Sequence, residues 1–442
     1  MVCMKYLLTI LAAIGIAANV AAQQNIISLK ECLETGLKQN YDILISRNEQ
    51  RISENNATAA NAGMLPSLAL SAGYMTSADR TDTTPREGDK VVDDAAFDQT
   101  VDVGLSLNWT LFNGMSVRAN YNKLRELEQM GELKTRLTIE DFVANLTAEY
   151  YNLIQQTLRL KNFRYAVSLS RERLRITEAR YQIGDFSRLD LLQARVDFNA
   201  DSSQYMSQQE AVIASRIRIN ELMANKDINA KCVARDSVIK VNGNLRWEEL
   251  SAQMTANNVS LLISDHNTNI SMLDLKAVKS RNYPYLKLAA GYGYTLNRFG
   301  SGTTKLRGTL GPNVGLNLGF TLFDGNRRRE QRNAKIEVEN AIYERNQIEQ
   351  SLQADLANFW QAYLNNLEVV KLEKQNVIAA KENYEIAMER YLLGDLPGIE
   401  MREAQKSLLD AEERILTAEY NTKLCEISLM QISGNILQYL YE

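Results

Sequence analysis

The stretch Thr110-Leu111-Phe112-Asn113-Gly114 returns later in the chain as Thr321-Leu322-Phe323-Asp324-Gly325, shifted by 211 positions (321 − 110). Each copy ends a run in which apolar and polar residues alternate, and each precedes a long stretch with a helical pattern. This duplication predicts two structural repeats. In each of them, β-strands lead directly into a very long helix.

The beginning of the chain has the pattern of an export signal. Lys5 precedes an apolar stretch over residues 6–18, and the small residues Val20-Ala21-Ala22 form a cleavage site. We therefore expect residues 1–22 to be a signal peptide and the mature chain to be exported. The remaining sequence has no stretch near the roughly 20 apolar residues of a transmembrane helix, so any membrane segment is expected to be built from strands.

Composition argues against several classes of function. The formal net charge is −4, which gives no basic field for nucleic acid. The mature cysteines Cys32, Cys232 and Cys425 are odd in number and widely spaced, which predicts neither a disulfide framework nor a zinc site. His266 is the one histidine, and its polar neighbours predict a solvated side chain. We expect no metal, no cofactor and no enzymatic activity.

Two stretches, residues 132–183 and 326–393, contain neither glycine nor proline. Because proline inside a helix costs about 3 kcal/mol, such stretches favour unbroken helices, here on the order of 100 Å long. A heptad stripe supports coiled-coil-like packing. Its members are Leu146, Leu153, Leu160, Val167, Leu174 and Tyr181, and 210 positions later Leu356, Tyr363, Val370, Val377, Tyr384 and Tyr391. We predict long helical hairpins over residues 115–224 and 326–434.

Four runs with a period of two predict strands at about residues 67–76, 101–110, 285–294 and 313–322. Each has about the 9–11 residues that a tilted strand needs to cross a bilayer. A soluble β-layer packed on the helices is the alternative. An isolated coiled-coil rod would explain the heptads but not these runs.

Four strands cannot close a barrel in a membrane, because open edges would leave backbone groups without hydrogen bonds in hydrocarbon. Three protomers would supply twelve strands, whereas two would supply only eight around a lumen too narrow for transport. The expected fold class is therefore mainly α with a membrane β-barrel segment: a trimeric 12-stranded barrel continued by an α-helical barrel. The expected layout is a first repeat over residues 23–224, a linker or equatorial segment over 225–246, a second repeat over 247–434 and a tail over 435–442.

These features together resemble the TolC-type outer-membrane efflux protein family. The resemblance lies in the signal peptide, the duplicated motif ending in Phe-Asn/Asp-Gly, and the turn Tyr-x-x-Gly-Asp at Tyr181–Asp185 and Tyr391–Asp395. It covers about residues 26–434. It implies a homotrimer in outer-membrane lipid, an α-helical barrel across the periplasm and an entrance at the hairpin tips. It also implies a periplasmic adaptor and an inner-membrane pump of the RND or ABC type as partners.

The resemblance further implies that acidic residues of the second tip surround the entrance. Counted from Gly394, these positions are Glu400 and Glu403, which lie one helical turn apart. In a trimer they would form two rings of three carboxylates that attract cations and repel one another. An ordinary acidic helix start, favoured by the helix dipole, is the alternative.

The turn residues themselves are Gly184, Asp185, Gly394, Asp395 and Pro397, and the two glycines are expected to adopt positive φ. Asp190 either closes a capping box with Ser187 or belongs to the aperture. Tyr391 matches a tyrosine that locks the closed tip in the family. The family's basic partner position falls at Leu396, and Arg188 and Arg402 are nearby substitutes.

The motif that ends each strand run is expected to join strand to helix and to form a structural collar. Its residues are Phe112, Asn113, Gly114, Phe323, Asp324 and Gly325. The run Arg327-Arg328-Arg329 that follows the second copy either binds an anion or pairs with acidic neighbours such as Glu330, and the sequence favours the second interpretation.

The predicted function is a passive trimeric duct in the outer membrane of a Gram-negative envelope, serving a tripartite efflux system that exports small molecules. The outer component of a type I protein-secretion system is one alternative. A non-conducting coiled-coil protein of the envelope is another.

Overall fold

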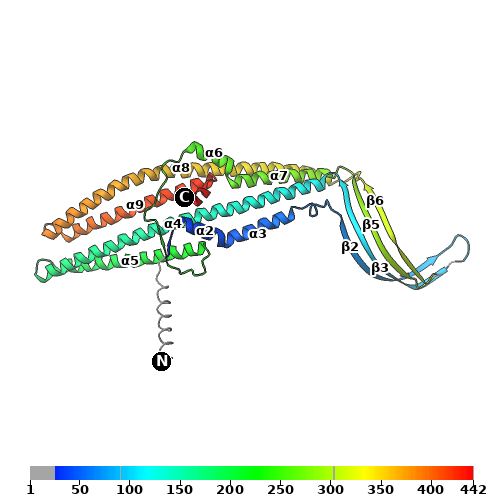
Figure 1. Cartoon of the computed structure of the whole chain (residues 1–442), viewed down its shortest axis with the longest axis horizontal. Helices are drawn as coiled ribbons and strands as arrows, with labels where there is room; N and C mark the ends of the chain where they lie inside the picture. The colour runs from blue at the N-terminus through cyan, green and yellow to red at the C-terminus, as the bar shows by residue number, and fades with distance from the viewer. Residues whose placement is uncertain (1–24, 90, 302–303, 442) are drawn as a thin grey trace, which may run out of the picture. The chain divides into compact units, whose positions relative to one another are not determined.

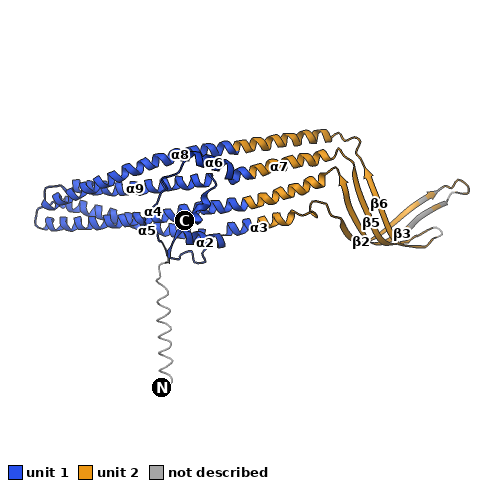
Figure 2. Ribbon diagram, turned by 45° about the horizontal axis from the view of Figure 1, so that its top comes forward, with its two compact units in different colours: residues 1–48, 134–262, 348–442 blue, residues 49–133, 263–347 orange. Residues whose placement is uncertain are grey.

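The computed structural model describes residues 25–89, 91–301 and 304–441. The chain divides into two compact units (Figure 2). We call residues up to 48, 134–262 and 348–442 the helical unit, and residues 49–133 and 263–347 the strand unit. Each predicted repeat contributes residues to both units. The predicted signal peptide, residues 1–22, lies outside the described residues.

The strand unit contains one four-stranded antiparallel sheet in the order β2-β3-β5-β6 (Figure 1). Its strands are β2 (Ser67–Thr83), β3 (Val91–Asn113), β5 (Tyr285–Arg298) and β6 (Leu306–Gly319). The first three predicted strands lie inside β2, β3 and β5. The predicted end of the fourth, residue 322, is wrong: β6 ends at Gly319, which pairs with Tyr285, the first residue of β5. Pro284 precedes Tyr285 and has no N–H to continue the ladder.

Helices of the strand unit follow and precede these strands. They are the first part of α4 (Ser116–Gln182), the first part of α8 (Arg327–Leu393), most of α7 (Val259–Ser280) and the end of α3 (Tyr41–Asn56). An ion pair between Lys123 and Asp274 (2.8 Å) joins α4 to α7, and His266 makes a hydrogen bond between the same two helices. Its Nδ1 lies 2.7 Å from Glu126 and its side chain is 22% exposed, so the predicted solvated histidine is instead a partly buried partner of α4.

Two long helical hairpins make up most of the helical unit. The remainder of α4 pairs with α5 (Arg188–Leu222), and the remainder of α8 pairs with α9 (Gly398–Ile432). Around them lie α2 (Leu29–Gln39), α6 (Trp247–Asn257), the parallel strands β1 (Asn25–Ile27) and β4 (Cys232–Ala234), and the short helix η1 (Ile436–Leu440). The predicted segment 225–246 thus contributes β4. Among the described residues, no helix is both long and apolar enough to cross a membrane.

The core of the helical unit gathers side chains from α2, α4, α5, β4 and η1. Leu33, Leu146, Tyr150, Ile219 and Ile436 are fully buried there. Leu146 belongs to the predicted heptad stripe. Cys32 and Cys232 lie in the same cluster as free thiols. Burial, followed by the nearby Cys232, raises the pKa of the Cys32 thiol to about 12, so this side chain packs as a small apolar group.

Candidate functional site at the hairpin turns

Both hairpins reverse direction at a glycine with positive φ, as the sequence predicts. Gly184 has φ 83° and Gly394 has φ 90°. The amide of Asp185 donates to the carbonyl of Arg180 over 2.9 Å, and Asp395 donates to Arg390 over 3.0 Å. These bonds satisfy carbonyls at the ends of α4 and α8 that have no partner within their helix. The two turns therefore have closely similar backbones.

Tyr391 is the buried centre of the site. It is 1% exposed, and its hydroxyl lies 3.0 Å from Thr177 Oγ1 on α4. The ring of Phe186 lies 6.3 Å away, between centroids. Tyr181, at the same position of the first repeat, is 40% exposed. Only the tyrosine of the second repeat therefore holds one hairpin against the other.

Arg180 is the basic partner of this tyrosine. Its guanidinium donates to the carbonyls of Leu392 over 2.8 Å and Tyr391 over 3.3 Å, at the end of α8. It also lies 5.1 Å from the ring centroid of Phe186 and 5.9 Å from that of Tyr391. A cation is favoured there by the helix dipole and by the aromatic faces. The carbonyls, the dipole and the two rings therefore all hold this arginine against the end of α8.

The substitutes that the sequence suggested, Arg188 and Arg402, are not the partners of Tyr391 in this structure. Arg188 is exposed at the start of α5, and Arg402 pairs elsewhere. The last turn of α4 lies against the end of α8, so Arg180 reaches the carbonyls first. The sequence does contain a pattern that pointed to a basic residue at the turns: arginine directly precedes the tyrosine in both repeats, as Arg180-Tyr181 and Arg390-Tyr391.

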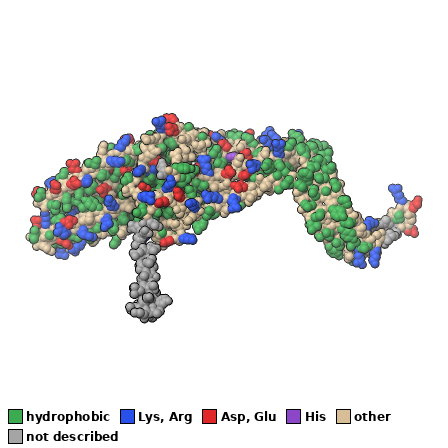
Figure 3. All heavy atoms as spheres, in the orientation of Figure 1, with side chains coloured by type: hydrophobic (Ala, Val, Ile, Leu, Met, Phe, Trp, Pro, Cys, Tyr) green, Lys and Arg blue, Asp and Glu red, His purple; other side chains and the backbone are tan. Residues whose placement is uncertain are grey.

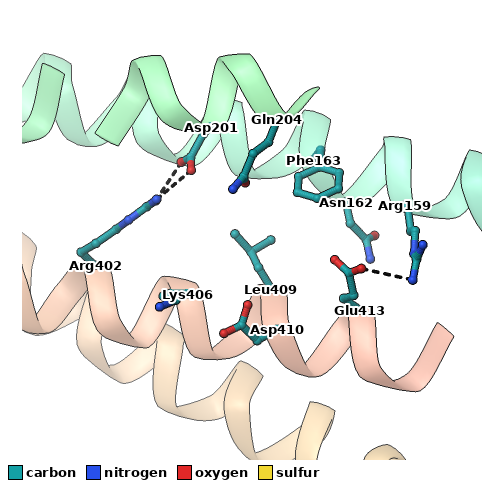
Figure 4. Close-up of a pocket in the computed structure, with 10 residues that line it drawn as sticks. All are labelled: Arg159, Asn162, Phe163, Asp201, Gln204, Arg402, Lys406, Leu409, Asp410 and Glu413. Carbon is teal, nitrogen blue, oxygen red and sulfur yellow. Dashed lines mark hydrogen bonds and ion pairs between the residues drawn. The ribbon is translucent and has the colours of Figure 1, made fainter. Parts of the chain in front are cut away.

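A second connection between the hairpins joins α5 to α9. Arg402 donates to both carboxylate oxygens of Asp201 over 2.7 and 2.8 Å, and Asp201 is 2% exposed. The hydrogen bonds that Arg402 donates to Asp201 raise the pKa of Arg402. Figure 4 shows this pair at one end of a cavity of about 170 Å³, with the Arg159–Glu413 pair (3.1 Å) at the other. Arg159 also donates to Thr417 over 2.9 Å. Sequence reasoning missed these residues, because nothing in the chain marks Asp201 as buried.

The predicted acidic aperture positions lie on the first turns of α9. Glu400 and Glu403 are both exposed. Pro397, the residue directly before α9, makes no side-chain hydrogen bond that caps the helix. Asp190 on α5 is engaged differently. Its Oδ2 accepts from the amide of Ser187 over 3.0 Å, and its own amide donates to Ser187 Oγ over 3.2 Å. The predicted capping box is confirmed, while an aperture role for these three acids stays a prediction.

The two strand–helix joints differ although their sequences match. At the first joint, Gly114 has φ 65°, and a Cβ there would lie 2.2 Å from the carbonyl oxygen of Ser280. Asn113 Oδ1 accepts from the amide of Val117 over 3.1 Å. At the second joint, Asp324 accepts from Arg281 over 2.9 Å, and Gly325 has only a distant ring atom of Phe323 near its Cβ position, at 3.9 Å. Only the first glycine is required by its surroundings.

Among the residues that the structure describes, no group of three or more His, Cys, Asp or Glu side chains is arranged to hold a metal ion.

Solved structures share this fold across most of the chain. The CmeC outer membrane channel of Campylobacter jejuni matches with a TM-score of 0.77 at 17% identity, over 92% of this chain and 85% of that one. The outer membrane protein VceC of Vibrio cholerae matches with a TM-score of 0.74 at 15% identity, over 92% and 96%. The duplicated arrangement of strands and long hairpins is therefore the fold of outer-membrane channels.

A family model described as outer membrane efflux protein matches residues 33–225 and 250–435, and the chain belongs to this family. The Outer membrane protein TolC of Vibrio cholerae is 21% identical over 410 residues, which cover 90% of this chain and 89% of that protein. The chain is accordingly an outer-membrane protein with a large periplasmic part. It is a channel protein rather than an enzyme.

Proposed function

We propose that this protein is the outer-membrane duct of a tripartite efflux system that exports small molecules. Three copies would join their sheets into one twelve-stranded barrel, continued by an α-helical barrel. A periplasmic adaptor and an inner-membrane pump of the RND or ABC type would act with it. The proposed layout keeps the repeats at residues 23–224 and 247–434, the signal peptide at 1–22, the equatorial segment at 225–246 and the tail at 435–442.

The observation that carries this proposal is a small sheet with two free edges and an exposed apolar face. In the described chain, β2 and β6 each pair on one side only. Their alternate side chains are apolar and open: Leu68 and Leu70 are 68% and 73% exposed, and Val314, Leu316 and Leu318 are 75%, 66% and 72% exposed. Hydrocarbon would accept these side chains, and neighbouring copies would pair the edges.

The closed state of the duct would be held at the hairpin turns. Opening the entrance requires the α8–α9 hairpin to move against the α4–α5 hairpin. This movement would break the Arg180 contacts to the end of α8, the Tyr391–Thr177 hydrogen bond and the Arg402–Asp201 pair. Glu400 and Glu403 would then line the aperture, with Asp190 beside it. The joints around Phe112–Gly114 and Phe323–Gly325 would form the collar between barrel and helices.

Conductance of the purified protein in planar bilayers tests the duct. We expect trimers with cation-selective channels whose selectivity falls in E400Q/E403Q. The matched control is E248Q/E249Q, which removes two exposed carboxylates from the first turn of α6. Trimers that never conduct, even with Glu400 and Glu403 neutralised, would contradict the proposal and favour a structural role.

A cellular assay tests the efflux role. Cells that lack the gene should accumulate a fluorescent pump substrate, and the intact gene should restore its export. Secretion of a protein into the medium that depends on this gene, with unchanged dye export, would instead favour the type I secretion alternative.

A further inference from the structure

The first turn of α8 carries positive charges that the dipole of the helix disfavours. The first residues of α8 are Arg327, Arg328 and Arg329, and Arg332 follows one turn later. Positive charges in the first turn of a helix lie at the positive end of its dipole, which destabilises the helix. The corresponding residues of the first repeat, 211 positions earlier, are Ser116, Val117 and Arg118. The additional arginines therefore do not serve the stability of the isolated helix.

Acidic neighbours do not neutralise this cluster, so the sequence-based expectation that Glu330 pairs with it is wrong. Glu330 and Asp324 both bind Arg281, which follows α7. Arg327 donates to the carbonyl of Thr321 over 2.7 Å.

Arg328 and Arg329 are exposed, and they have no ion-pair partner among the described residues. The second joint thus carries five guanidinium groups and two carboxylates, Asp324 and Glu330, which both pair with Arg281, so positive charge is in formal excess there. The five are Arg281, Arg327, Arg328, Arg329 and Arg332.

Apolar side chains lie directly before these arginines in the chain. Phe320, Leu322 and Phe323 are 50%, 88% and 87% exposed. Their counterparts in the first repeat, Trp109, Leu111 and Phe112, are only 36%, 40% and 37% exposed. The second set is open because it follows the edge strand β6. Figure 3 shows basic side chains gathered beside the apolar surface of the strands within the strand unit.

We propose that residues 320–332, the basic joint, bind the headgroup of an anionic phospholipid at the periplasmic face of the outer membrane. Guanidinium groups bind phosphate oxygens in a bidentate manner, and arginine clusters beside a membrane segment attract anionic headgroups. The exposed phenylalanine and leucine side chains would contact the parts of the acyl chains next to the headgroup, because burial in hydrocarbon is favourable for apolar surface. Charge complementarity selects an anionic lipid over a zwitterionic one. The site would anchor the second joint to the lipid, and the first joint would bind no such lipid.

Native mass spectrometry of the full-length protein in detergent tests this inference, with phosphatidylglycerol and phosphatidylcholine as probes. Wild-type protein should retain phosphatidylglycerol in preference to phosphatidylcholine. R328Q/R329Q should bind phosphatidylglycerol about thirtyfold more weakly, which corresponds to about 1 kcal/mol for each of two side chains. The matched control K371Q/K374Q removes the same charge from an exposed, distant part of α8 and should bind normally.

Three outcomes would overturn the proposal. The first is equal retention of phosphatidylglycerol by wild type and R328Q/R329Q. The second is full displacement by inorganic phosphate, which would reveal only a free-anion site. The third is loss of the trimer in R328Q/R329Q, which would show that the arginines contact another copy of the chain.

If R328Q/R329Q folds poorly, R328K/R329K keeps the charge and should lose only the bidentate part of the binding. Conductance should be unchanged in either variant, so failure here is distinguishable from failure of the duct proposal.

Discussion

The two strand–helix joints have nearly the same five residues and different structures. Phe112 pairs with Leu286 inside the sheet and is 37% exposed, whereas Phe323 lies beyond the end of β6 and is 87% exposed. Gly114 contacts the backbone at Ser280, and Gly325 has open space. The first joint follows a central strand and the second follows an edge strand. The repeated motif therefore does not by itself fix where a strand ends, because β3 continues to Asn113 while β6 ends at Gly319. The neighbouring strand and helix decide how tightly each joint is held.

The hairpin turns show the same asymmetry. Tyr181 and Tyr391 occupy equivalent positions, yet the first is 40% exposed and the second 1%. Arg180 reaches the carbonyls of the other hairpin, while its equivalent Arg390 makes only a 3.4 Å contact to Asp395 of its own turn. The two turns therefore have different roles: the first supplies the arginine, and the second supplies the buried tyrosine and the carbonyls that this arginine binds. Substitutions at paired positions separate the two roles.

The largest difference is expected between the glycines of the joints. Gly114→Ala should lower the free energy of unfolding by about 3 kcal/mol or more, because it combines positive φ with a collision against backbone. Gly325→Ala, the matched control, should change it by about 0.5 kcal/mol or less. Thermal unfolding of the purified proteins measures both. Equal effects would contradict the difference between the joints.

Arg402→Leu should have the next largest effect. Leucine is chosen because it is the residue at the equivalent position of the first repeat, Leu192. Removing the guanidinium leaves the buried carboxylate of Asp201 without its partner and should cost about 2–3 kcal/mol, discounted for the partial exposure of Arg402. Asp201→Ala introduces the residue found at the equivalent position of the second repeat, Ala411. Combined with Arg402→Leu in a double variant, it should recover part of the lost stability. No recovery in this double-mutant cycle would show that the pair is not coupled.

Arg180→Ala and Arg390→Ala test whether each turn helps to keep the channel closed. Loss of Arg180 removes the contacts to the end of α8, so the channel should open more often at low voltage. Loss of Arg390 should leave the open probability near that of wild type. Single-channel recording decides between them. If both variants open equally, the asymmetry of the turns has no role in closure.

Tyr391→Phe removes only the hydroxyl that contacts Thr177 and should cost about 1 kcal/mol. Tyr181→Phe, at the exposed counterpart, should be neutral. Thermal unfolding at identical pH measures the difference, and an equal loss in Tyr181→Phe would contradict it.

The smallest effect is expected from Glu419→Gln on α9, whose counterpart on α5 is Gln209. Burial raises the pKa of Glu419 above its ordinary value of 4.5. Its protonated form therefore favours the folded state at low pH, and this contribution is lost as the pH rises through the raised pKa. The variant should match wild type near pH 4 and be slightly more stable near pH 7. A gain that is the same at both pH values would contradict the assigned cause.

Sequence patterns predicted the helices of the two long hairpins and the four strands of the large sheet, because those depend on local features. The long stretches without glycine or proline became α4 and α8, and the tip glycines adopted the expected positive φ. The Ser187–Asp190 capping box was also visible within four residues of sequence. The end of β6 was missed because it depends on where its partner β5 begins.

Residues of the candidate site were predicted less completely. Tyr391 was singled out, but its contacts with Arg180 and Thr177 come from a helix more than 200 positions earlier in the chain. Asp201 and Arg402 were equally distant in sequence, and neither type of residue is expected to be buried without its partner. Similarly, the neighbours of Arg327–Arg329 suggested a local pair with Glu330, whereas Arg281 took that carboxylate.

The sequence by itself determined the duplication, the alternation of strands, the length of the helices and the glycine turns, because each follows from the period of its side chains or from backbone freedom over a few residues. The tertiary structure alone decided which of two equivalent residues is buried and which is exposed. The reason is physical: the environment of a side chain depends on the strand or helix packed against it, and the two repeats have different neighbours. Two copies of one motif thus became a tight joint and an open, basic one.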